Sequence, residues 1–98
     1  MKRLIFHTAA EQELLLAGQY YTEIDSLLGH RFSVEIEWLL SNICNAPQRY
    51  PIYDAPIRRH FSTVFPYAIL YVDRPDDVLV VAVMHMSRDP GYWRGRVE

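Results

Sequence analysis

Apolar residues at helical spacing fill most of the first half of the chain. They recur at steps of three and four over residues 10–28 and again over 32–43, which is typical of amphipathic helices that cover a core on one side. Thr8 and Glu11 have the spacing of a capping box, and Gly29 stands where the first helix is expected to end. The pattern predicts two antiparallel helices joined around Gly29.

The second half of the chain changes to the period of β-strands. A short apolar run at 4–6 precedes the helices, and three more runs follow at 57–61, 67–72 and 78–86. We therefore predict one α+β domain over residues 1–98 in the order β-α-α-β-β-β. The helical hairpin should pack on one face of a mainly antiparallel sheet of three to four strands. The other face is expected to be bare, with cations around its rim.

Two local features refine this fold. Strict alternation along the last strand would place Leu79, Val81, Val83 and His85 on one face of the sheet and the residues between them on the other. Gly18 lies inside the first predicted helix, where glycine costs roughly 1 kcal/mol relative to alanine. We expect it to let the second helix come close.

Composition and charge limit the possible functions. Half of the 98 residues are hydrophobic, which is a globular composition, and the formal net charge is −2. Any binding to nucleic acid would therefore need a local basic patch. Cys44 is the one cysteine, which favours a reducing compartment. No apolar run approaches the roughly 18 residues of a membrane span, and the N-terminal run is too short for a signal peptide. We expect a cytoplasmic protein without a membrane partner.

Several short segments stand in a fixed order along the chain. They are residues 28–32, 57–59, 65–71 and 81–85, followed by Arg88, Asp89 and Pro90 and then by Tyr92, Trp93 and Arg94. Together they resemble the RelE/ParE superfamily of bacterial toxins over nearly the whole chain. The resemblance implies the toxin half of a type II toxin–antitoxin system, of the kind found in plasmid stabilisation, which a cognate antitoxin binds and masks.

The resemblance leaves the cellular target open. One branch of the superfamily, similar to RelE, cleaves messenger RNA on the ribosome, and another, similar to ParE, poisons DNA gyrase. One fold carries both activities, so the fold alone does not choose between them. The alternative is a decayed, non-toxic family member that acts only as a protein-binding module. The sequence also leaves open whether the chain forms a homodimer.

Four residues are candidates for an RNA-cleaving site. His85 ends the longest apolar strand and could transfer a proton near neutral pH, while Arg58, Arg59 and Arg88 could hold phosphate through their planar guanidinium groups. Arg58 and Arg59 are adjacent on a strand and should point to opposite faces. The competing interpretation is that these two arginines are solvated edge charges and that His85 packs at the sheet margin.

An aromatic and basic cluster lies at the C-terminus and consists of Arg88, Tyr92, Trp93, Arg94 and Arg96, with Tyr92, Trp93 and Arg94 as its candidate binding residues. Stacking of a base on an aromatic ring contributes roughly 1–3 kcal/mol, so the cluster is a candidate for binding nucleic acid or another target. Alternatively, Tyr92 and Trp93 fold back on the sheet as a hydrophobic lid while the arginines stay in water.

Charge is distributed unevenly along the chain. The region of the predicted helices is acidic, and we expect its acids, Glu13 among them, on the outer side of the hairpin. An acidic, apolar antitoxin segment could then lie across the basic sheet, although two solvated helix faces would look the same. Lys2 is the one lysine, whereas the resemblance implies a lysine-rich surface for the RNA-cleaving branch. The histidines and Cys44 lack metal-ligand spacing, and we expect neither a metal nor a cofactor.

Overall fold

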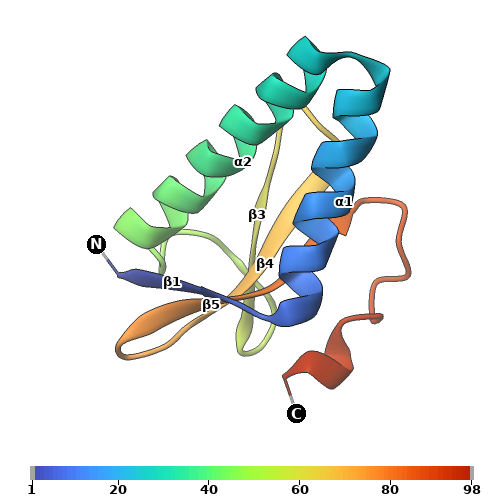
Figure 1. The fold of residues 1–98 in the computed structure, drawn as a ribbon. Coiled ribbons are helices and arrows are strands. Elements are labelled where there is room, and N and C mark those ends of the chain that lie inside the picture. Colours follow the sequence, from blue (N-terminus) through green and yellow to red (C-terminus); the bar gives the residue numbers. More distant parts are fainter. Residues whose placement is uncertain (1, 98) are drawn as a thin grey trace.

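The computed structural model describes residues 2–97 and has the predicted order of α-helices and strands with one additional strand. The chain runs through strand β1 (Arg3–Phe6), helices α1 (Thr8–Ile24) and α2 (Ser26–Asn45), strands β2 (Ile52–Asp54), β3 (Ile57–Phe61), β4 (Tyr67–Asp73) and β5 (Asp77–His85), and a short 3-10 helix at Arg94–Arg96. Figure 1 shows the two helices as a hairpin on one side of the sheet. The α+β class is therefore confirmed.

The sheet has five strands in the order β1-β5-β4-β3-β2, which is more than the three to four expected. The addition is β2, whose three residues are too short to show a period of their own. β1 pairs in parallel with β5, and the other pairings are antiparallel, so the sheet is mixed. No helix in the described part of the chain is long and apolar enough to cross a membrane.

The helices begin and end at side-chain caps that differ from the expected ones. α1 is capped by His7, whose Nδ1 accepts from the Ala9 amide at 3.0 Å, so Thr8 is the first helical residue and the capping box is wrong. The joint between the helices is Asp25, whose carboxylate accepts from the Leu27 amide at 2.8 Å. Because this cap starts α2 at Ser26, the expected joint around Gly29 is also wrong.

Gly29 lies inside α2, where its backbone packs closely against Thr22 of α1. A β-carbon there would stand 2.0 Å from Thr22 Oγ1 and 2.8 Å from Thr22 Cα, so only glycine fits against α1. Gly18 has no heavy atom within 4 Å of such a β-carbon. The expected role of Gly18 in close helix approach is therefore wrong, and Gly29 has that role.

The main core lies between the helical hairpin and the sheet. The stripe predicted on the second helix is fully buried there, as are alternate residues of β4, with these members: Phe32, Ile36, Leu39, Ile43, Ile69 and Tyr71. Ala10 and Ala17 bring α1 close to the sheet, while Ile24 at the end of α1 is 58% exposed. The predicted alternation of β4 is confirmed, since Ala68 and Leu70 face the other way.

β5 does not alternate strictly, because a β-bulge interrupts it. Leu70 pairs with Ala82 and Tyr71 pairs with Val80, which leaves Val81 without a partner on β4. Val80 and Val83 both belong to the core under the helices, whereas Val81 and Ala82 belong to the opposite side. The expected common face of Val81 and Val83 is therefore wrong, and the bulge turns the end of β5 toward α1.

The far face of the sheet is covered by the chain's own C-terminal segment. Trp93 is 2% exposed and packs with apolar residues of three strands: Ile57, Ala68, Leu70, Ala82 and Met84. The Trp93 indole N–H donates to the Pro90 carbonyl at 2.8 Å, so its polar atom is satisfied. The expectation of a bare far face is wrong, and Trp93 forms the lid that was the alternative.

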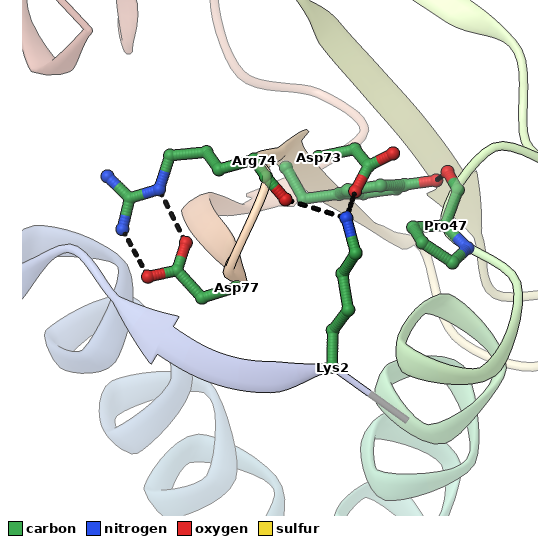
Figure 2. Close-up of polar contacts among 6 residues, drawn as sticks. Lys2, Pro47, Asp73, Arg74 and Asp77 are labelled. Carbon is green, nitrogen blue, oxygen red and sulfur yellow. Dashed lines mark hydrogen bonds and ion pairs between the residues drawn. The ribbon is translucent and has the colours of Figure 1, made fainter.

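Lys2 fastens β1 to the turn between β4 and β5, as Figure 2 shows. Its ammonium group donates to Asp73 Oδ1 and to the Arg74 carbonyl, both at 2.6 Å. In the same turn the Arg74 guanidinium donates two hydrogen bonds to Asp77 and thereby lowers the pKa of that carboxyl group. The single lysine therefore holds the edge of the sheet.

The two glycines of the hairpin give opposite predictions for stability. We expect Gly29→Ala to lower the free energy of unfolding by about 1–3 kcal/mol, because the new methyl group collides with Thr22 backbone. Gly18→Ala should raise it by about 0.5–1 kcal/mol, because alanine is the better helix former and meets no atom. Urea denaturation of both variants measures this, and equal effects would contradict the helix contact described above.

The two tryptophans give a second matched pair. Trp93→Ala removes a buried side chain from the far face and should cost about 3–5 kcal/mol. Trp38 on α2 is 55% exposed, so Trp38→Ala should cost about 1 kcal/mol or less. Thermal and urea unfolding compare them, and a small effect at position 93 would mean that the C-terminal segment does not cover the sheet.

Candidate functional site

A cleft of about 220 Å³ lies at the end of β5, between α1 and the C-terminal segment. α1 contributes one helical face to it, β4 and β5 contribute its floor, and the C-terminal segment contributes a wall. The lining residues are Glu13, Leu16, Ala17, Tyr20, Tyr67, Val83, His85, Arg88 and Tyr92. The cleft therefore combines three tyrosine rings with the imidazole of His85, the guanidinium of Arg88 and the carboxylate of Glu13.

The β-bulge places His85 in this cleft. Because the bulge reverses the alternation after Val81, His85 lies on the helix side of the sheet and pairs with Tyr67 across the strands. The two rings meet edge to face, with 5.0 Å between centroids. His85 Nδ1 accepts from the Ser87 amide at 3.0 Å, which orients the imidazole in the cleft lining.

An ion pair closes the edge of β5 beside the cleft. The last residue of β1, Phe6, pairs with Val80, so the strand edge beyond that point has no neighbouring strand. There Glu13 Oε1 accepts from the Val83 amide at 3.1 Å, and Arg96 Nη1 donates to the Val81 carbonyl at 3.1 Å. The two side chains thus make the hydrogen bonds that a further strand would make.

Glu13 and Arg96 also bind each other through two hydrogen bonds. The guanidinium nitrogens of Arg96 lie 2.9 and 3.1 Å from the two Glu13 oxygens, and each side chain is 16% exposed. Such a paired geometry is the strongest that arginine makes with a carboxylate. Glu13 was expected on the solvent side of the hairpin, and this expectation is wrong.

Arg88 is the available cation of the cleft. Its guanidinium stacks on the Tyr92 ring, with 3.9 Å from Cζ to the ring centroid, and it forms no ion pair with any of residues 2–97. Burial, followed by the Glu13 carboxylate, raises the pKa of Tyr92 well above its usual value. Burial likewise raises the pKa of Tyr67. Arg88 is therefore an exposed cation of the cleft without an ion-pair partner among the described residues.

The other two candidate arginines lie away from this cleft and on opposite faces, as predicted. Arg58 is on the helix side, where its Nη1 donates to the Tyr50 carbonyl at 2.8 Å and to the Gln48 carbonyl at 3.3 Å. Arg59 is on the far face, where its Cζ lies 4.1 Å from the ring centroid of Tyr53 and 4.2 Å from that of Phe61. The structure therefore brings His85 and Arg88 together and leaves Arg58 and Arg59 elsewhere.

The C-terminal cluster is also divided. Tyr92 lines the cleft, while Trp93 is buried under the far face of the sheet. Arg94 forms an ion pair with Asp54 of β2 at 2.7 Å and does not line the cleft. Sequence reasoning missed Glu13, Leu16 and Tyr20. Their spacing was readable as one helical face that includes Ala17, but only the buried member of that face stood out in the pattern.

The architecture is that of a small α+β protein, and it has a counterpart among solved structures. A chain of the solved chromosomal ParDE toxin–antitoxin system from P. aeruginosa superposes with a TM-score of 0.75. The match covers 89% of this chain and 98% of that chain at 10% sequence identity, so it shows the fold.

The family model described as ParE toxin of type II toxin-antitoxin system, parDE, matches residues 4–90. The chain therefore belongs to the ParE toxin family, which confirms the resemblance inferred from the sequence and implies an antitoxin as its partner. No curated protein sequence matches the chain.

The different surroundings of two arginines can be tested by stability. Arg58→Met removes charged hydrogen bonds to two loop carbonyls and should lower the free energy of unfolding by about 1.5–3 kcal/mol. Arg88→Met loses only the stack on Tyr92 and should stay within about 1 kcal/mol of the parent. If urea unfolding gave the reverse order, Arg88 would be a structural residue and the cleft would lack a free cation.

Proposed function

We propose that the chain inhibits growth by binding DNA gyrase through the cleft at the end of β5, and that its cognate antitoxin masks it. The gyrase target is what the ParE branch of the superfamily implies. The observation that carries the choice of a binding mechanism is that the four candidate residues for RNA cleavage do not form one site. Arg58 and Arg59 are held by contacts on opposite faces of β3, away from His85.

The charges of the cleft also favour a protein target over RNA. Glu13 lies in the same hollow as His85 and Arg88, and the net charge of the chain is −2. RNA binding draws on many cations that release counterions from phosphates. An arginine surrounded by tyrosines and an exposed leucine, as with Arg88, Tyr92 and Leu16, is the composition of a protein-binding hot spot.

RNA cleavage is the second candidate, and one observation favours it. His85 and Arg88 do line the same cleft, together with Tyr20, Tyr67 and Tyr92. A proton-transferring imidazole beside a free guanidinium has part of the chemistry that cleavage at a 2′-hydroxyl needs. This mechanism depends on proton transfer by His85, whereas a binding poison depends on the shape and charge of the cleft.

The two mechanisms differ in their response to His85→Gln. Glutamine keeps a polar side chain of similar reach but transfers no proton near neutral pH, so a nuclease should lose about 10²–10⁴-fold in activity. We expect induced His85→Gln to inhibit growth within about threefold of the parent, and Arg88→Glu to lose inhibition at least about tenfold, because it reverses the charge at a contact. Arg94→Gln is the matched control outside the cleft.

The measurement is induction of each variant in growing bacteria, with separate readouts of plasmid supercoiling and messenger RNA integrity. Loss of negative supercoiling with intact messenger RNA supports the proposal. Fragmented messenger RNA that disappears in His85→Gln would establish the nuclease instead. Normal growth in the presence of folded parent protein would leave only the protein-binding module.

A further inference from the structure

We propose that Arg96 is a positioning residue of the cleft: through Glu13 and Tyr92 it holds Arg88 where a partner can reach it. The proposal rests on the proposed function only in taking the cleft as the functional surface. The family model ends at residue 90, so Arg96 lies in a segment outside the family pattern. The sequence placed Arg96 in the C-terminal aromatic and basic cluster but indicated no contact with Glu13.

Arg96 anchors the C-terminal segment to α1 through Glu13. Arg96 binds both oxygens of Glu13 and also the Val81 carbonyl, so three hydrogen bonds fix its guanidinium against the bulge of β5. Both side chains are mostly buried. Breaking such a partly buried charged pair from one side leaves the other charge unpaired, which disturbs the local geometry.

The ring of Tyr92 connects Arg96 with Arg88. The Arg96 Cζ lies 4.9 Å from the centroid of this ring, and the Arg88 Cζ lies 3.9 Å from the same centroid. Tyr92 is also a wall of the cleft. Arg88 is exposed and has no ion pair within residues 2–97, so its stack on Tyr92 is what sets the direction of its guanidinium.

The same segment has a second, independent anchor on the far face of the sheet. Trp93 is buried in the far-face core, and Arg94 is paired with Asp54 at 2.7 Å. Loss of the Arg96 anchor should therefore leave the segment on the sheet and free only its cleft side. Arg94→Met supplies a matched control, because it breaks an ion pair of the same segment that does not touch the cleft.

The experiment follows the arginine side-chain N–H resonances by NMR and the inhibition of purified gyrase in the same variants. Stacking on Tyr92 should displace the Arg88 Nε–H resonance upfield through the ring current. We expect Arg96→Met to move this resonance toward its random-coil position and to weaken gyrase inhibition about tenfold, the effect of one misplaced charged contact. Arg96→Lys, which keeps the charge without the fork, should recover part of both.

Two further variants separate the ion pair of Arg96 from other contacts of the C-terminal segment. Glu13→Gln retains an acceptor for the Val83 amide while removing the ion pair, and it should move the Arg88 resonance as Arg96→Met does. Arg94→Met should change neither readout, and buried Trp93 fluorescence reports that each variant is folded.

An unchanged Arg88 resonance in folded Arg96→Met overturns the proposal. A displaced resonance with full inhibition also overturns it, since the position of Arg88 would then not matter for function. If the parent chain does not inhibit gyrase, the proposed function fails, while the resonance still decides whether Arg96 positions Arg88.

Discussion

The β-bulge at Val81 is the constraint on which the candidate site depends. A regular β5 would send His85 to the far face, beneath the C-terminal segment and away from α1. Because Val81 has no partner on β4, the side chains after it point to the other face of the sheet. His85 therefore lies against Tyr67 on the side of α1. Beside the bulge, beyond the end of β1, the Val81 carbonyl and the Val83 amide lie at an edge without a strand, where Arg96 and Glu13 bind them. The bulge thus places His85 in the cleft, next to the anchor formed by Arg96 and Glu13.

Both faces of the sheet are covered by other parts of the chain, which leaves the cleft at its end as the proposed functional surface. The helical hairpin buries one face, and Trp93 with its strand neighbours buries the other. Arg58 and Arg59, adjacent in sequence, are divided between these two faces and serve loop carbonyls and aromatic rings. The cleft is therefore where an unpaired cation, aromatic surface and solvent meet, and it is the surface through which the proposed binding to a protein target would take place.

The sequence predicted the parts of the fold that rest on long periodic patterns. The stripe of α2, the stripe of α1 as far as Tyr21, the alternation of β4 and the order of elements are confirmed, because burial imposes a period on many residues at once. Single-residue geometry was less predictable. The bulge, the Asp25 cap and the contact of Gly29 with Thr22 each depend on one residue in its tertiary surroundings. Glu13 and Arg96 stand 83 positions apart, and no local pattern links them.

We propose that the cleft at the end of β5 is the surface that meets the cellular target. Hydrogen–deuterium exchange of the toxin, alone and with purified DNA gyrase, tests this contact. We expect slower exchange on gyrase binding in residues 13–20 of α1 and in residues 83–92, with β2 and β3 unchanged. Slower exchange around Arg58 and Arg59, with the cleft unaffected, would contradict it.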